Sequence, residues 1–205
     1  MNTDTNNQTA SQNIFNEEKS FRNYRPRLSF YHANGKGTGS AARFEVVPAS
    51  SDQAGVIYLT LAQQKSIATG MDDQGKRQYA TFDWQNRVTV KLNFSDLCQM
   101  LLIFRGQATV IAEGKGLYHD SRNTTTIINL TRQTEPYAGL ALEVSRRSKI
   151  ESEPAVRIRI VFKDAEAFGI GAVLEQSLGI IAFGIPKEAS YTPATIRPEA
   201  ELPAV

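Results

Sequence analysis

Hydrophobic and polar residues alternate along much of the chain with the period of half-buried β-strands. The clearest case is residues 155–162, AVRIRIVF, in which Val156, Ile158 and Ile160 share one face. The same period recurs in short segments that polar or glycine-containing stretches separate. The pattern predicts strands at residues 27–32, 40–48, 55–65, 78–84, 88–92, 117–119, 124–132, 140–145 and 155–162. Residues 107–113 fit either a short strand or a turn-forming segment.

Two segments change to the period of a helix. In the first, Asn93 or Ser95 can cap the N-terminus, Asp96 falls in the first turn, and Gly106 fits a left-handed C-terminal stop. Its apolar residues are Leu97, Met100, Leu101, Leu102, Ile103 and Phe104. A short helix with so wide an apolar surface packs either in the core of its own domain or against another subunit. The second helix covers residues 165–182 and is opened by Asp164.

The elements therefore follow the order of about four strands, a helix, about four strands and a helix. Four meandering strands form an antiparallel sheet with one covered face. The predicted fold class is α+β: two four-stranded antiparallel β-sheets, each followed by a helix (ββββα repeated).

The 205 residues are enough for one domain with tails. Residues 1–24 are polar and rich in Asn, Thr and Gln, so they predict a disordered tail. Residues 186–205 hold four prolines and few large apolar groups, and they predict a second, Pro-rich tail. The folded domain is expected at residues 25–185.

The composition says more about the cellular compartment of the protein than about its function. Lys and Arg number 23 against 21 Asp and Glu, so a nucleic-acid binder with this balance must gather its cations on one face or rely on stacking. Cys98 is the only cysteine, which excludes an intrachain disulfide and favours a reducing compartment. The sequence contains no run of about 18 apolar residues, the length that would predict a membrane-spanning helix. Its acidic N-terminal segment resembles neither a secretory signal nor an organelle transit segment. We expect a cytoplasmic, nucleoid-associated protein without a membrane partner.

Little in the sequence points to catalysis. The only histidines are His32 and His119, and no Gly-x-Ser-x-Gly, His-Glu-x-x-His or Cys-x-x-Cys motif occurs. One cysteine and two scattered histidines do not make a zinc site. We therefore expect a protein that is not an enzyme and has no metal, cofactor or small-molecule substrate.

Aromatic and basic residues gather in and beside the predicted strands. Proteins that bind single-stranded nucleic acid combine aromatic platforms for bases with cations that follow the phosphates. Tyr31 and Arg146 belong to this general population, from which we select the candidate contact residues. They are Lys36, Phe44, Tyr58, Lys65, Tyr79, Phe82, Trp84, Lys91, Tyr118, Arg157 and Arg159. Each alone also fits an ordinary strand, since aromatics are enriched in strands and arginines suit a solvated sheet face.

The segment NGKGTGS at residues 34–40 holds a lysine between glycines just before a strand. Its spacing fits neither a P-loop nor a dinucleotide fingerprint, because a strand follows instead of a helix. Glycines here permit either a plain hairpin loop or the close approach of a sugar-phosphate backbone.

From about Tyr31 to Phe183 the order of motifs resembles the Whirly family of single-stranded DNA-binding proteins. The resemblance rests on GKGTGSAA at residues 35–42, on FDW at residues 82–84 before a strand and helix, and on YHD at residues 118–120. It rests also on the closing strand and long apolar helix at residues 157–184. Each motif is short, but the four occur in the family's order at compatible spacing.

The resemblance implies two four-stranded sheets, a homotetramer with its helices at the centre, and single-stranded DNA bound along the sheets and between subunits with little sequence preference. Carried over by motif, the glycine–lysine box implies DNA contacts at Lys36 and Gly37, and the FDW motif implies them at Phe82 and Trp84. The other candidates come from the residue pattern alone. Thr38 replaces the second lysine usual in the plant proteins, and the tail is no organelle address; both indicate a distant prokaryotic or phage-borne relative.

The leading hypothesis is a non-enzymatic single-stranded DNA-binding protein that acts in replication, recombination or repair. Two alternatives stay open. The same surface could bind single-stranded RNA, because a stacking platform does not itself distinguish the sugars. The protein could instead be a structural oligomer whose sheet faces bind protein partners.

Overall fold

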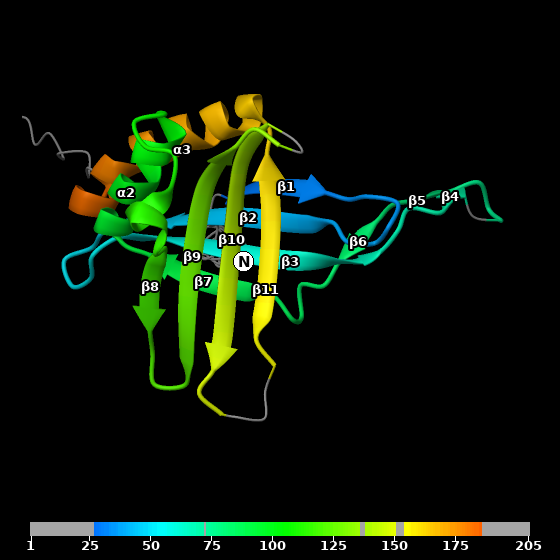
Figure 1. Cartoon of the computed structure of the whole chain (residues 1–205), viewed down its shortest axis with the longest axis horizontal. Coiled ribbons are helices and arrows are strands. Elements are labelled where there is room, and N and C mark those ends of the chain that lie inside the picture. The colour runs from blue at the N-terminus through cyan, green and yellow to red at the C-terminus, as the bar shows by residue number, and fades with distance from the viewer. Residues whose placement is uncertain (1–26, 72, 136–137, 151–153, 186–205) are drawn as a thin grey trace, which may run out of the picture.

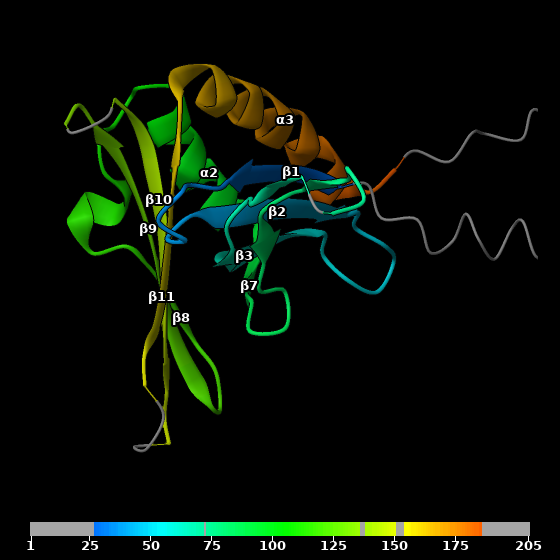
Figure 2. The ribbon, with the colours of Figure 1, turned by 90° about the vertical axis from the view of Figure 1, so that its right-hand side faces the viewer.

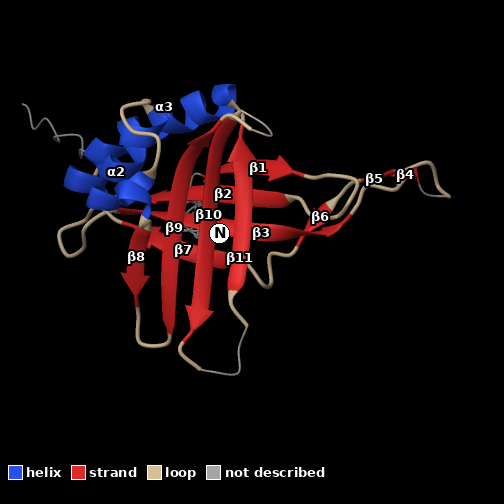
Figure 3. Cartoon of the chain, in the orientation of Figure 1, coloured by secondary structure: helices blue, strands red, loops and turns tan. Residues whose placement is uncertain are grey.

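The computed structural model describes residues 27–71, 73–135, 138–150 and 154–185. Two β-sheets cross one another, with the strands of one running across those of the other, and two helices lie together at one end (Figures 1 and 3). Figure 2, turned by a quarter, shows the second sheet edge-on beside the first, with the longer helix above the first sheet. The predicted tails at residues 1–24 and 186–205 lie outside the described residues.

The first sheet comprises β1 (Arg27–His32), β2 (Ser40–Val47), β3 (Val56–Ser66), β6 (Thr81–Phe82) and β7 (Val88–Leu92). Strands β1, β2 and β3 are antiparallel neighbours, and β6 and β7 both pair with the far edge of β3. A register shift between Gln64 and Ser66 accompanies the β6 pairing. A small separate hairpin, β4 (Gly70–Met71) and β5 (Arg77–Gln78), projects from this end of the sheet (Figure 1).

The predicted strand at residues 78–84 is corrected by the structure. Only Arg77–Gln78 and Thr81–Phe82 are strand there, and a turn at Asp83 separates the latter from β7. Asp83 Oδ1 accepts hydrogen bonds from the backbone N–H groups of Gln85 and Asn86, at 3.2 Å each, so its side chain replaces a sheet partner. The fourth position of the first sheet is therefore a broken strand, and the ββββα pattern is matched only in part.

The second sheet is a regular antiparallel meander of β8 (Leu117–Asp120), β9 (Thr124–Gln133), β10 (Gly139–Ser148) and β11 (Val156–Phe162), in the order β11-β10-β9-β8. The ambiguous segment before it contains a 3-10 turn, Ile111–Gly114, in which Ala112 and Glu113 are left-handed at φ 45° and 55°. One isolated bridge joins Val110 to Thr131. Residues 107–113 are thus mainly a turn-forming segment.

Helix α2 (Phe94–Phe104) starts and stops where the sequence indicates. Asn93 is the N-cap: its side chain accepts from the N–H of Asp96, and the Asp96 carboxylate accepts from the N–H of Asn93. Gly106 lies at φ 72°, the left-handed conformation that favours glycine. The buried residues of α2 include Leu97, Met100 and Ile103, so most of its apolar surface belongs to its own domain's core.

Helix α3 (Asp164–Phe183) buries one face, which includes Ile170, Leu174 and Ile181, and exposes apolar groups on another. By length and composition it could span a membrane, with a mean hydropathy of 1.3. The expectation from sequence concerned an unbroken run of about 18 apolar residues, and α3 is not one, because Glu166, Glu175 and Gln176 interrupt it. Because the buried face completes the core, we interpret α3 as a core helix, with Phe168 and Phe183 among its exposed side chains.

Each helix is joined to the sheet of the other half. His119 on β8 lies 3.1 Å from the carboxylate of Asp96 in the first turn of α2. His32 on β1 lies 2.9 Å from Glu166 in the first turn of α3. Burial raises the pKa of Glu166, but hydrogen bonds from His32 and the N–H of Lys163 outweigh this and leave it below its usual value. The two halves are interlocked, which fixes the angle between the sheets.

Candidate nucleic-acid interface

An aromatic cluster lies on the face of the first sheet that points away from the helices. Tyr31 comes from β1, Phe82 from β6, and Trp84 from the turn after β6. The ring centroids of Tyr31 and Phe82 are 5.5 Å apart, and those of Tyr31 and Trp84 are 6.3 Å apart. The Arg43 guanidinium lies 4.3 Å from the centroid of the Trp84 ring. The sheet thus presents aromatic faces together with a stacked cation, the combination that binds nucleobases.

The turn around Asp83 holds Trp84 in place. Hydrogen bonds from the side-chain amide and backbone N–H of Asn86 lower the pKa of Asp83, so this residue remains an ionised acceptor. Arg87 Nη1 donates to the carbonyl oxygen of Trp84 at 2.6 Å. The break in the fourth strand therefore has a consequence for the site, because it lets Trp84 leave the sheet ladder and reach Arg43.

Three neighbouring cavities continue from the cluster and form what we call the groove. The first, of about 550 Å³, is lined by Tyr31, Ala33, Tyr79, Ala80, Thr81, Phe82 and Trp84. The second, of about 410 Å³, shares Trp84 and adds Arg43, Glu45, Tyr58, Thr60, Arg87 and Thr89. The third, of about 710 Å³, shares Thr89 and is lined further by Val90, Lys91, Asn93, Tyr118, His119, Asp120, Ser121, Thr124, Thr126 and Arg146. Each cavity therefore shares one lining residue with the next, Trp84 between the first two and Thr89 between the second and third.

Several cations on the groove are not neutralised. Among the described residues, Lys91, Arg87 and Arg146 have no carboxylate within ion-pair distance. Arg43 is 3.9 Å from Glu45, and its buried Nε has no hydrogen-bond partner in the described part of the chain. An unpaired buried donor beside a cavity marks a place for an acceptor from a ligand or water.

The glycine–lysine loop is fixed beside the aromatic end of the groove by Gln64. Gln64 Oε1 accepts from the N–H groups of Asn34 and Gly39 at 2.9 and 3.0 Å. Its Nε2 donates to the carbonyl oxygens of Asn34 and Ser66 at 3.0 and 2.9 Å. A Cβ at Gly39 would lie 2.1 Å from the carbonyl oxygen of His32, so only glycine fits there. These contacts hold the loop that contains Lys36, and Ala33 at the start of this loop lines the first cavity.

We expect Gln64→Leu to release this loop. The change removes four hydrogen bonds and leaves backbone donors without partners, at a cost of roughly 2–4 kcal/mol in unfolding free energy. Chemical denaturation measures that loss. Gln63→Leu, at an exposed neighbour with one hydrogen bond to β11, is the matched control, and an equal loss in both variants would contradict the role of Gln64.

The structure brings together half of the residues selected from sequence. Tyr58, Tyr79, Phe82, Trp84, Lys91 and Tyr118 line the groove. Lys36 and Gly37 lie in the adjoining loop, where Gly37 has a φ of 73°. Lys65 is exposed beside Gln64, and its charge contributes to lowering the pKa of Asp83.

Three selected residues lie elsewhere. Phe44 is 3% exposed and packs against Phe162, with ring centroids 6.4 Å apart, which corrects its assignment as a base-stacking residue. Arg157 and Arg159 lie on the opposite face of the second sheet from its buried Ile158 and Ile160, away from the groove. Arg157 Nε is 2.9 Å from Glu143, and Arg159 donates to Gln133. These two arginines are a paired, solvated sheet face.

Arg43 and Arg87 were not found from sequence, and Tyr31 and Arg146 were noted without being selected. The alternation of polar and apolar residues in a strand predicts which side chains point away from the core. It does not predict which of these side chains contact one another. Only the pairing of β2 with β1 and β3, and the turn at Asp83, bring Arg43 to Trp84.

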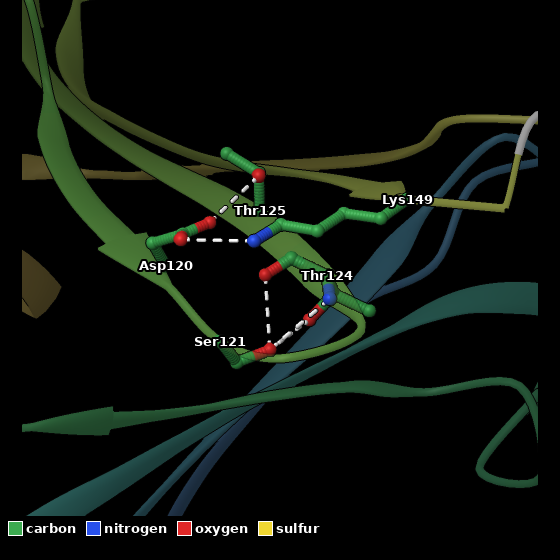
Figure 4. A network of polar contacts seen from close by, with 5 residues as sticks. All are labelled: Asp120, Ser121, Thr124, Thr125 and Lys149. Atoms are coloured by element: carbon green, nitrogen blue, oxygen red, sulfur yellow. Dashed lines mark hydrogen bonds and ion pairs between the residues drawn. The ribbon is translucent and has the colours of Figure 1, made fainter.

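A polar network lies at the turn between β8 and β9 of the second sheet (Figure 4), and three of its residues, Asp120, Ser121 and Thr124, line the third cavity. Asp120 Oδ2 is 2.9 Å from Lys149 Nζ, and its Oδ1 accepts from Thr125 at 3.0 Å. The hydrogen bond from Lys149 and the one from Thr125 lower the pKa of Asp120. Ser121 Oγ hydrogen-bonds with Thr124 across the turn at 2.9 Å. The one carboxylate on this rim is therefore already neutralised by its own partners.

The fold and this surface define the chain's structural class as Whirly-like. The chain resembles the crystal structure of WHY3 from Arabidopsis thaliana with a TM-score of 0.56 and 12% identity, over 77% of this chain and 89% of that one. It resembles the plant transcriptional regulator PBF-2 with a TM-score of 0.53 and 12% identity, over 77% and 82% of the two chains. For WHY1 from Arabidopsis thaliana the values are 0.52 and 12%, over 78% and 86%.

No protein-family model matches the chain, and no curated protein matches its sequence. The structural likeness at this identity concerns the fold, which confirms the Whirly-like architecture indicated by the motifs. Within the residues that the structure describes, no group of three or more His, Cys, Asp or Glu side chains could hold a metal ion.

Proposed function

We propose that this chain binds single-stranded DNA along the groove, without catalysis and with little dependence on base sequence, in replication, recombination or repair. The observation that carries the proposal is the contact among Tyr31, Phe82, Trp84 and Arg43, which offers aromatic and guanidinium faces to bases. Every base has a π-face, so stacking of this kind tolerates any sequence. Lys91 and Arg87, which have no carboxylate within ion-pair distance in the described part of the chain, supply contacts for phosphates along the same path.

The resemblance to the Whirly family supports a nucleic-acid ligand, and so does the likeness to PBF-2, a plant transcriptional regulator. The deciding experiment is fluorescence anisotropy with labelled single-stranded and duplex DNA of equal length, at low and moderate salt. We expect tight binding to the single strand and weak binding to the duplex. Absence of binding to either would overturn the proposal and leave the fold unchanged.

A matched RNA oligomer belongs in the same titration. Stacking on Trp84 does not distinguish ribose from deoxyribose, so the ratio of the two affinities decides which nucleic acid is preferred. If RNA binds much more tightly than DNA, the same groove is an RNA interface.

We propose further that the chain forms a homo-oligomer, a tetramer, through its helices. Exposed apolar side chains gather on them: Leu102 is 47% exposed, Phe168 78%, Val173 43% and Phe183 91%. The two helices lie together at one end of the molecule (Figure 1), so these groups lie on neighbouring elements. An exposed apolar surface of this kind is characteristic of a subunit contact.

We expect Phe168→Glu to lower the molar mass measured by light scattering, because it places a charge in the apolar contact. Met71→Glu is the control, because Met71 is 75% exposed and lies on the β4–β5 hairpin at the opposite end of the first sheet from the helices (Figure 1); this change should leave the mass unchanged. A wild-type protein that is already monomeric would contradict the oligomer proposal, and the proposal that the groove binds single-stranded DNA would be unaffected.

A further inference from the structure

Arg146 on β10 connects the two sheets across the third cavity of the groove. Its Nε donates to Thr126 Oγ1, on β9 of its own sheet, at 3.1 Å. Its Nη2 donates to the backbone carbonyl oxygen of Thr89, on β7 of the other sheet, at 2.5 Å. His119, Thr126 and Arg146 are paired in register, so they form one row on the inner face of the second sheet.

The partners of this guanidinium are neutral. Burial lowers the pKa of Arg146, yet an arginine remains charged at physiological pH. No carboxylate lies within ion-pair distance of it among the described residues. A partly desolvated cation whose partners in the described ranges are a hydroxyl and a carbonyl has no counter-charge there.

The surrounding cavity has the chemistry of an anion site. At about 710 Å³ it has the size of a small-molecule pocket, and Lys91 faces it from the first sheet. The polar residues Ser121, Thr124 and Asn93 also line it. Its acidic neighbours are occupied, since Asp120 is paired with Lys149 (Figure 4) and Asp96 is paired with His119.

We propose that this cavity binds a phosphate group of the nucleic-acid strand, which accepts hydrogen bonds from the free N–H groups of Arg146 and an ion pair from Lys91. The proposal rests on the proposed function and adds to it a defined phosphate subsite between the two sheets of one chain. Because Thr126 and Thr89 fix the guanidinium from both sides, little side-chain entropy is lost when the phosphate binds.

A purely structural role for Arg146 is distinguishable from this one. As a latch between the sheets, it would affect stability in proportion to its two hydrogen bonds and would leave the electrostatics of binding unchanged. As a phosphate ligand, it contributes to the number of counterions that the strand displaces, which the salt dependence of binding reports.

The test compares Arg146→Gln with Arg147→Gln by anisotropy on a single-stranded oligothymidylate at four salt concentrations. Arg147 is the next residue, is exposed and lies on the other face of β10, so both variants lose one charge from the same strand. We expect Arg146→Gln to weaken binding roughly tenfold at low salt and to reduce the slope of log K against log salt by about 0.7. Arg147→Gln should retain nearly the wild-type slope, and Arg146→Lys should restore most of it.

Equal slopes for Arg146→Gln and Arg147→Gln would overturn the subsite. If Arg146→Gln folds poorly, an NMR measurement on the wild-type protein replaces it. The Nε–H resonance of Arg146, assigned by its loss in Arg146→Lys, should shift when oligonucleotide is added. A shift with inorganic phosphate and none with oligonucleotide would overturn the assignment to a strand. If wild-type protein binds no oligonucleotide at all, the proposed function and the strand phosphate subsite fail together. If it binds oligonucleotide but Arg146→Gln keeps the wild-type slope, only the subsite fails.

Discussion

Trp84→Ala is expected to weaken binding of single-stranded DNA by about 5- to 150-fold, at every sequence tested. One stacked base contributes roughly 1–3 kcal/mol, and Trp84 offers the largest aromatic face of the groove. It also lies between two of the three cavities and supports Arg43 at 4.3 Å, so its loss disturbs two ligand contacts. Anisotropy with oligonucleotides of differing sequence measures the effect.

Trp84→Phe is the control, because it keeps an aromatic face and should recover most of the affinity. The slope of log K against log salt should be unchanged in Trp84→Ala, since a stacked base releases no counterion. Trp84 is only partly buried, so the melting temperature should fall little. If a folded Trp84→Ala protein bound single-stranded DNA with unchanged affinity, the aromatic cluster would not be part of the interface.

The regular parts of the fold follow from local pattern. The alternation in β11 and the capping signals around α2 need only neighbouring residues, and the structure confirms both. The broken fourth strand was not predicted, because the Asp83 turn interrupts residues whose β-propensity favours a continuous strand. The Asp83 side chain accepts hydrogen bonds that a neighbouring strand would otherwise provide, and the hydrophobic periodicity of the sequence does not reveal such a substitution.

The candidate site was harder to predict than the fold. Trp84 and Tyr79 stand out by type, but Phe44 has the same type and points inward, since its neighbours on β2 decide which face is the core. Arg157 and Arg159 repeat at the spacing of a basic stripe, yet Glu143 on β10 pairs with Arg157 and Gln133 on β9 accepts from Arg159. Whether a cation is free or paired depends on strand register, which one sequence does not supply.

The shape of the groove depends on how the two halves of the chain pack together in the core. The third cavity has one wall on each sheet, so its shape depends on how the sheets are held. The pairs His119–Asp96 and His32–Glu166 hold them at the helix ends, and Phe162 holds them in the core. A core change that loosens the sheets should therefore also affect ligand binding.

Phe162→Ala is the core change with the largest expected effect on stability. Phe162 on β11 is fully buried, with ring centroids 5.3 Å from Phe30 and 6.4 Å from Phe44, both of the other sheet. Emptying this position should lower the free energy of unfolding by roughly 3–5 kcal/mol, a large part of the stability of an ordinary domain. Urea denaturation measures the loss, and Phe162→Leu should lose less because it fills more of the space.

Tyr79→Ala provides the contrast, because Tyr79 is 70% exposed and lines the groove. It should change stability by no more than about 0.5 kcal/mol while weakening binding of single-stranded DNA. In Phe162→Ala, by comparison, binding should fall together with the folded fraction and recover when added oligonucleotide stabilises the native state. If Phe162→Ala were as stable as Tyr79→Ala, the two sheets would not share one core, and the groove between them would need another explanation for its shape.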